Sequence, residues 1–199
     1  MQVRLSDYFA RLAEIGTLMQ AEGADGMALD PSDALAQAVT LVTAAKRHRS
    51  RIMFVGNGGS AGIASHMATD WLKNGGYAAT CFNDGSALTC IANDLGYERV
   101  FALQIERHCR KGDVLIAISS SGKSPNILEA VAAARRAGAA VITLSGFDAV
   151  NPLRKLGDLN FWVPDGHYGF VEISHLAICH AMLDVSMGAL QAARESVDA

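Results

Sequence analysis

Apolar residues recur at intervals of three and four along the first part of the chain. From position 5 they are Leu5, Tyr8, Phe9, Leu12, Ile15 and Met19. This spacing predicts an amphipathic helix, which the polar stretch "EGADGMALDP" ends. A second helix is predicted to begin at a cap on Ser32 or Asp33 and to run to about His48. Two helices therefore precede the rest of the fold.

After Arg51 the pattern changes to short apolar runs that alternate with helical stretches. The runs are "RIMFV", "ATCF", "DVLIAI", "AVITLS" and "LNFWV". Continuous apolar strands separated by helices are typical of a parallel sheet that is covered on both faces. The sequence therefore predicts an α/β fold, with a doubly wound, mostly parallel sheet flanked by helices. We expect one domain over residues 1–199, with an N-terminal helical extension of about residues 1–50.

The last predicted helix, from about Val171 to Leu190, is apolar on nearly every side. Its apolar residues are Leu176, Ile178, Cys179, Met182, Leu183, Val185 and Leu190. A helix with so little polar surface is usually buried, and here we expect it to lie between subunits. The N-terminal helices and this helix together predict a homo-oligomer.

Composition narrows the class of protein. The chain has 199 residues, half of them hydrophobic, and a net charge of −3. Its one basic cluster, "KRHRSR" at 46–51, is interpreted as the solvated end of a helix, so no nucleic-acid partner is expected. The four cysteines form no CxxC pair, and no apolar stretch reaches the ~18 residues of a membrane span. We therefore expect a cytoplasmic protein with no membrane partner.

Two turns stand out because glycine or serine follows an apolar strand directly. The first is "GNGGSAG" and the second is "SSSGKSPN", in which Ser124 is a predicted helix cap and Pro125 the first helical residue. In open α/β sheets, ligands bind beyond the carboxyl ends of the strands, where helix N-termini offer free N–H groups. Hydroxyl donors that could surround a phosphate there are Ser119, Ser120, Ser121 and Ser124.

Other interpretations of the glycine and serine turns remain open. Each turn alone is explained by a tight bend or a helix cap. A P-loop is excluded because no GxxxxGK[ST] is present. Gly56, Gly58 and Ala61 fit the GxGxxA of a dinucleotide site, with Asp84 at the end of the next strand, although that reading leaves the serine turn unexplained.

Two pairs of polar residues are candidates for chemistry. His66 and Asp70 lie four apart on a predicted helix and share one face, which suits either two ligands of one metal or an acid/base pair. The alternative is a solvated helix face. Glu172 and His180 lie eight apart, a rise of ~12 Å, so either Glu172 stands at a flexible first turn or the two serve different parts of a site. His175 is predicted to be a packing or interface residue.

Five stretches together resemble the sugar isomerase (SIS) domain proteins and, within them, the phosphoheptose isomerase family. They are "GNGGSA", "HMATD", "ANDLGYERVFALQ", "GDVLIAISSSGKSPNILEAVAAARRAGAAVITLSG" and "EISHLAICH". The resemblance runs from about residue 5 to 190. It implies an SIS-type, flavodoxin-like fold and a homotetramer with sites at subunit interfaces.

The resemblance also implies roles for individual residues. Substrate would be bound by Asn57, Gly58, Gly59, Ser60, Asn93, Asp94 and the four serines of the second turn. Zinc would be held by His66, Asp70, Glu172 and His180. Departures from the family pattern surround the sugar: Asp70 replaces a glutamate, Glu172 a glutamine and Asn74 an arginine, and "VPDGHYGFVE" lacks an Asp-Arg pair.

The function implied is that of a sugar-phosphate aldose–ketose isomerase, converting sedoheptulose 7-phosphate to D-glycero-D-manno-heptose 7-phosphate or acting on a related phosphosugar. Such a reaction moves a proton between C1 and C2 through an enediol, which needs a base of near-neutral pKa and stabilisation of the enediolate oxygen. We expect His180 to transfer the proton, with Asp70 or Glu172 as its counterpart. The alternative is a non-catalytic SIS protein that binds a phosphosugar or a protein partner, of the replication-initiator-associating type.

Overall fold

The computed structural model describes residues 4–188, which form a seven-stranded sheet in the order β2-β1-β7-β6-β5-β3-β4. The strands are β1 (Gln20–Gly23), β2 (Ala28–Leu29), β3 (Arg51–Gly56), β4 (Ala78–Cys81), β5 (Val114–Ser119), β6 (Ala140–Gly146) and β7 (Leu159–Val163). Strands β3 to β7 are parallel to one another, whereas β1 is antiparallel to β7 and to β2. The predicted mostly parallel α/β fold is confirmed.

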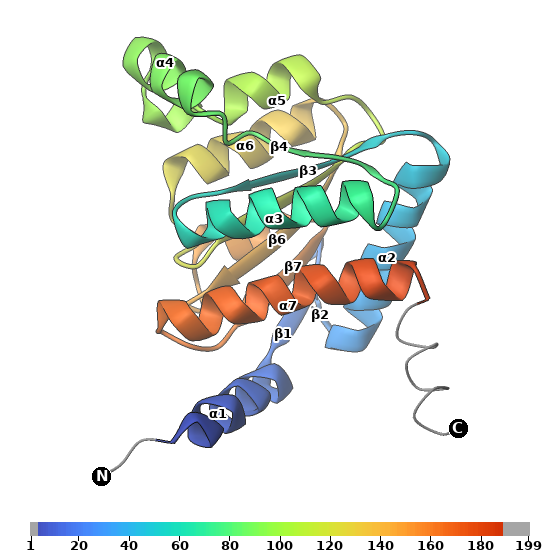
Figure 1. Cartoon of the computed structure of the whole chain (residues 1–199), viewed down its shortest axis with the longest axis vertical. Helices are drawn as coiled ribbons and strands as arrows, with labels where there is room; N and C mark the ends of the chain where they lie inside the picture. Colours follow the sequence, from blue (N-terminus) through green and yellow to red (C-terminus); the bar gives the residue numbers. More distant parts are fainter. Residues whose placement is uncertain (1–3, 189–199) are drawn as a thin grey trace.

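Helices cover both faces of this sheet (Figure 1). They are α1 (Leu5–Leu18), α2 (Pro31–Arg47), α3 (Gly59–Lys73), α4 (Gly85–Leu95), α5 (Ala102–His108), α6 (Pro125–Arg136) and α7 (Tyr168–Ser186), with short 3-10 turns η1 (Tyr97–Arg99) and η2 (Pro152–Lys155). Side chains of β3 alternate between two apolar clusters. Ile52 and Phe54 pack with α2, α3 and α7, whereas Met53 and Val55 pack with α5 and α6. Burial on both faces explains why the strands are continuously apolar.

The strand register brings the two special turns together. Gly56, the last residue of β3, lies opposite Ile118 of the neighbouring strand β5, and Ser119 lies opposite Ser145 of β6. The glycine turn and the serine turn therefore begin at the same edge of the sheet, one strand apart. Both are followed directly by a helix, so the N-termini of α3 and α6 lie at this edge as well.

The N-terminal segment differs from the prediction. Strands β1 and β2 lie within the stretch that was expected only to separate two helices, and β1 forms because its backbone pairs along β7. The predicted cap of the second helix was also wrong. Asp30 caps α2, since its side chain accepts a hydrogen bond from the Ser32 amide at 2.8 Å and Pro31 occupies the first helical position.

Helix α1 extends away from the body of the domain (Figure 1). Among its residues only Ile15 is buried, while Leu5 and Phe9 are exposed. Arg11 is anchored to Asp165 at 2.8 Å, and Tyr8 stacks on Phe170 with ring centroids 4.6 Å apart. The predicted helix is present, whereas the oligomer stays a prediction. Over residues 4–188, no helix combines the length and the apolarity that crossing a membrane requires.

Helix α7 begins and ends earlier than predicted, and Leu190 lies outside the described residues. Its residue His175 is fully buried, and the ring atom Nε2 lies 3.0 Å from the backbone oxygen of Ser145. Burial lowers the pKa of His175 to about 4, because the imidazolium would be removed from water; the contact with Ser145 raises it only in part. His175 is thus a packing residue, one of the two roles that the sequence predicted.

Acid should therefore destabilise the fold through His175. The neutral ring contributes its full stability above the unfolded-state pKa of about 6.5, and this is lost as the pH falls toward the folded-state pKa of about 4. Such a difference corresponds to about 3 kcal/mol between pH 7 and pH 4. In urea unfolding, the free energy of His175→Gln should depend less on pH over this range than that of the wild type. Equal pH dependence in the two proteins would show that the ring is protonated as easily in the fold as in the unfolded chain.

Candidate functional site

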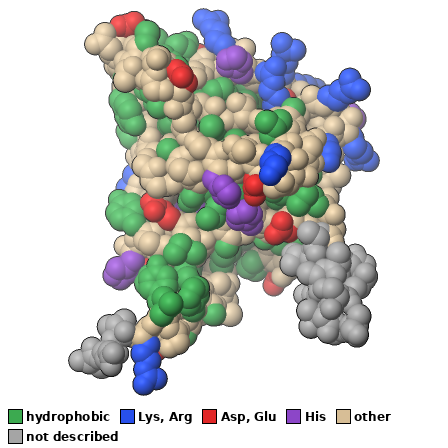
Figure 2. Space-filling model, in the orientation of Figure 1, with side chains coloured by type: hydrophobic (Ala, Val, Ile, Leu, Met, Phe, Trp, Pro, Cys, Tyr) green, Lys and Arg blue, Asp and Glu red, His purple; other side chains and the backbone are tan. Residues whose placement is uncertain are grey.

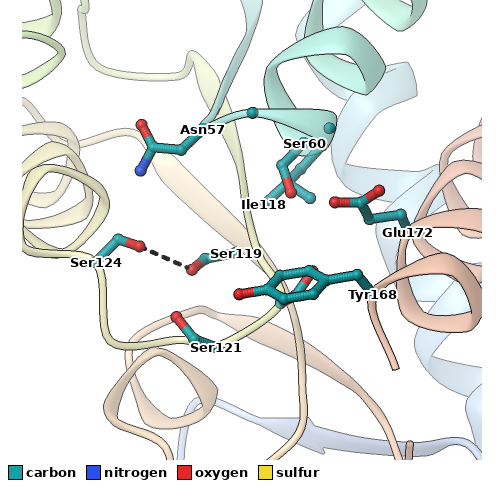
Figure 3. Close-up of a pocket in the computed structure, with 11 residues that line it drawn as sticks. Asn57, Ser60, Ile118, Ser119, Ser121, Ser124, Tyr168 and Glu172 are labelled. Atoms are coloured by element: carbon teal, nitrogen blue, oxygen red, sulfur yellow. Dashed lines mark hydrogen bonds between the residues drawn. The ribbon is translucent and has the colours of Figure 1, made fainter. Parts of the chain in front are cut away.

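A cavity of about 250 Å³ lies at the sheet edge where the two turns meet (Figure 3). It is bounded by the first turn of α3, the serine turn after β5 and the first turn of α7. Its lining residues are Asn57, Gly58, Gly59, Ser60, Ile118, Ser119, Ser120, Ser121, Ser124, Tyr168 and Glu172. Eight of these are residues that the sequence predicted to bind substrate, and they come from two segments about sixty residues apart.

The glycine turn needs two of its glycines for specific geometric reasons. Gly58, the residue that caps α3, has φ of 55°, a left-handed conformation that residues with a Cβ rarely adopt. A Cβ on Gly56 would lie 2.6 Å from the backbone of Ser60. The absence of side chains lets the backbone turn sharply from β3 into α3. The amides of Ala61 and Gly62 donate to the backbone oxygen of Gly58, and the first two residues of α3, Gly59 and Ser60, line the cavity.

The serine turn presents hydroxyls to the same space. The Oγ atoms of Ser119 and Ser124 lie 3.5 Å apart, and Figure 3 shows them facing one another across the turn. Ser124 caps α6 by position, as predicted, but its hydroxyl makes no capping hydrogen bond. Ser120 Oγ is buried and has no hydrogen-bond partner among residues 4–188.

Backbone N–H groups from two helix N-termini and several hydroxyls, with no lysine or arginine among the lining residues, suit an anion such as phosphate. The positive ends of the helix dipoles favour the same charge. This geometry supports the prediction of a phosphate-binding site. The alternative interpretation as a dinucleotide site required Asp84 as its acidic residue at the end of a strand. Asp84 instead lies three residues beyond β4, and its carboxylate caps α4 by accepting a hydrogen bond of 2.8 Å from the Ala87 amide.

Two residues of the site were missed from the sequence. Asn126, in the first turn of α6, exchanges two hydrogen bonds of 2.9 Å with the side chain of Asn57, which joins the glycine turn to α6. The sequence feature that could have indicated Asn126 is its place directly after Pro125, the first residue of the helix. A side chain at such a position is usually exposed, so its burial was not expected. Tyr168 begins α7 and lies over the serine turn in Figure 3, with its ring edge-on to Phe147 at 4.9 Å.

Glu172 lies on the other wall of the cavity, in the first turn of α7. Its carboxylate is so close to Gly59 that a Cβ on that glycine would lie 2.4 Å from the carboxylate oxygens. A carboxylate here faces the N-terminal end of α3. Glu172 lines this cavity and His180 does not, which favours the alternative that the two residues serve different parts of a site.

A second group of polar residues lies farther along α3 and α7. His66 Nε2 is 3.3 Å from His180 Nε2, and the Asp70 carboxylate lies 3.9 Å from the first ring and 3.8 Å from the second. One ligand atom from each of the three residues falls within 4.8 Å of the others, a spacing that could hold a metal ion. Asp70 also accepts a hydrogen bond of 2.9 Å from Asn74, one turn later on the same helix.

Not every predicted residue reaches these two places. Glu172 is not part of the histidine group, so three of the four predicted metal ligands come together. Asn93 and Asp94 are exposed near the end of α4 and do not line the cavity; the amide of Asn93 donates to Asp94 at 2.8 Å. Within one chain, the structure therefore separates this pair from the serine turn.

A mostly parallel sheet with a cavity at its carboxyl edge, lined by two helix-starting turns whose groups suit an anion, defines the class of doubly wound α/β domains. Residues 25–146 match the family model of the SIS domain. Phosphoheptose isomerase of Rhodospirillum rubrum is 37% identical over 169 residues, covering 81% of this chain and 88% of its relative. That of Aeromonas hydrophila is 34% identical over 182 residues, covering 87% and 92%. The chain belongs to the SIS domain family, and to its phosphoheptose isomerase branch.

The solved structures agree with this placement. Phosphoheptose isomerase of Neisseria gonorrhoeae superposes with a TM-score of 0.79 at 33% identity, covering 93% of this chain and 97% of that one. The structure from Francisella tularensis gives a TM-score of 0.76 at 25% identity, covering 92% and 95%. The likeness therefore extends over almost the whole fold.

Proposed function

We propose that the chain converts sedoheptulose 7-phosphate to D-glycero-D-manno-heptose 7-phosphate. Its family makes it an aldose–ketose isomerase that acts on a sugar phosphate. The observation that carries the choice of a seven-carbon substrate is the spacing between the phosphate cavity and the histidine group.

That spacing follows from two helices that lie alongside each other (Figure 1). Gly59 contacts Glu172 near the start of α3 and α7, and His66 contacts His180 seven and eight residues later. Seven to eight residues of helix span ~10–12 Å. An extended seven-carbon chain places C1 roughly 10 Å from the phosphorus of a 7-phosphate, given bonds of about 1.5 Å. A phosphate in the cavity would therefore present C1 and C2 to the histidine group.

At that end of the site, we assign proton transfer to His180, with Asp70 as its counterpart. The Asp70 carboxylate lies 3.8 Å from His180 Nδ1, on the opposite side of the ring from Nε2. A carboxylate on the Nδ1 side favours a proton there and leaves Nε2 as the base for the proton at C1. Asn74 holds the other oxygen of Asp70 and so limits its rotation. Glu172, nearer the phosphate, is assigned to the sugar hydroxyls.

His66, Asp70 and His180 are also the residues that would hold zinc, since their two nitrogens and one oxygen are donors that zinc accepts. Because zinc on Nε2 of His180 would occupy the lone pair that takes the proton, zinc ligation and proton transfer by His180 are alternative roles of this group. Three protein ligands are the number found in catalytic zinc sites, which keep one position open. A bound ion would supply positive charge for the enediolate oxygen. The proposal of a homotetramer rests on the family resemblance and on the exposed apolar face of α1.

Metal content tests the zinc assignment directly. After purification in the presence of zinc, we expect His66→Ala and His180→Ala to carry much less zinc per chain than the wild type, by elemental analysis. His48→Ala, at an exposed histidine beyond the end of α2, is the matched control and should keep the wild-type content. If all four proteins contain the same zinc, the ion is held elsewhere.

The reaction itself is tested by isotope exchange. The protein is mixed with sedoheptulose 7-phosphate in heavy water, and deuterium uptake at C1 of the ketose and C2 of the aldose is followed by NMR. We expect exchange with this substrate, and less with five- and six-carbon ketose phosphates, whose reacting carbons reach less far from the cavity. Absence of exchange with every substrate in zinc-containing buffer would leave the non-catalytic alternative.

A further inference from the structure

A surface on the opposite edge of the sheet from the cavity is rich in lysine and arginine. Segment 46–51 contributes four such residues and segment 107–111 contributes three, with no acidic residue in either. The fold joins the two segments, because the guanidinium of Arg51 donates to the backbone oxygen of His108. Figure 2 shows basic side chains gathered at the upper right, where the ends of α2 and α5 lie in Figure 1.

The cations of the two segments are gathered on one surface and, within the described residues, lack the acidic partners that several other cations have. Arg99, Arg136 and Arg154 each lie within 4.0 Å of a carboxylate. Among residues 4–188, none of the seven cations of the two segments has such a partner. The nearby Asp113 is buried and is occupied by the backbone amides of Arg51 and Arg110. A chain of net charge −3 thus keeps a local surplus of positive charge.

The basic surface adjoins an open edge of the sheet. Strand β4 is the last strand in the sheet order, and its residues are exposed or half-buried, whereas β5 is fully buried. Its side chains near this end are small, and a hollow of about 270 Å³ is lined by Arg51, Ala78, Ala79, Thr80 and His108. An edge strand has one row of backbone N–H and C=O groups without strand partners, and another extended chain can pair with them.

We propose that this edge binds an extended, acidic segment of a partner protein, which pairs with β4 as an added strand while its carboxylates contact segments 46–51 and 107–111. Strand addition draws affinity from backbone hydrogen bonds and specificity from the flanking side chains. Single-stranded nucleic acid is less well matched, because neither segment contains a Phe, Tyr or Trp on which a base could stack. Arg51 and Ala78 are the first residues of β3 and β4, and they lie at the opposite end of the sheet from the cavity. Binding at this surface therefore does not require catalysis.

The probe is a fluorescein-labelled peptide of five Glu-Thr repeats, with binding followed by anisotropy at low and physiological salt. Replacing its glutamates by glutamine should weaken binding at least tenfold. Two further peptides carry N-methyl groups on every glutamate or on every threonine. Since only alternate N–H groups of an added strand face its neighbour, one methylated peptide should bind as the parent does and the other at least tenfold more weakly.

On the protein side, Arg107→Gln/Arg110→Gln should weaken peptide binding at least tenfold and leave isomerase turnover unchanged. The matched control is Arg4→Gln/Lys155→Gln, which removes two cations outside the two segments that have no carboxylate partner within residues 4–188; it should bind as the wild type does. Equal affinity for both methylated peptides would rule out strand addition. Tighter binding of a 20-base-pair DNA duplex than of the peptide would assign the surface to nucleic acid instead.

Discussion

His180→Ala is expected to lower kcat for sedoheptulose 7-phosphate by ~10²–10⁴-fold, the range for loss of a general acid or base. KM should change little, because the phosphate would still bind between the glycine and serine turns, ~10–12 Å away along α7. The loss should be visible as slow deuterium uptake under saturating substrate. A large rise in KM with kcat preserved would instead place His180 in substrate binding.

Two further variants separate the candidate partners of His180. Asp70→Asn keeps the size of the side chain but removes its charge, and it should show a loss of kcat comparable to that of His180→Ala. Glu172→Gln is the matched control, because it makes the same chemical change at the phosphate end of the site, beside Gly59. It should retain most of kcat. The reverse order of effects would make Glu172 the proton-transfer partner.

Gly122→Ala should disrupt the serine turn and with it the phosphate site. Gly122 has φ of 61°, and an added Cβ would lie 1.9 Å from the Oδ1 atom of Asn151. Asn151 cannot move away easily, since it is fully buried and its amide donates to the backbone oxygen of Asp148 at 2.8 Å. The left-handed conformation alone costs roughly 1–2 kcal/mol for a residue with a Cβ. We expect that loss of unfolding free energy or more, and KM raised at least tenfold.

Gly26→Ala isolates the contribution of the clash. Gly26 also has a positive φ, of 76°, but an added Cβ would meet no atom within 4 Å. The variant should show the backbone cost alone and keep the wild-type KM. If the two variants have the same stability and the same KM, Asn151 does not support the serine turn.

Several parts of this protein were determined by local sequence. Five apolar runs predicted β3 to β7. Four of these strands are buried on both faces and so must be apolar throughout, whereas the edge strand β4 is only partly buried. The serine turn could be placed because Ser124 and Pro125 favour a helix start in any context. Gly138, with φ of 80°, follows the end of that helix, α6. The pairing of His66 with Asp70 on one face follows from helix geometry alone.

Tertiary structure decided what local pattern leaves open. The short strand β1 has little strand propensity of its own, with Gly23 at its end, and exists because β7 offers a free edge. His66 and His180 are 114 residues apart, and only the packing of α3 against α7 brings their rings together. The same packing places Glu172 beside Gly59 and away from the histidines. Sequence spacing fixes distances within one helix, whereas contacts between elements depend on how whole surfaces are buried, and this is why the chemistry of the site required the fold.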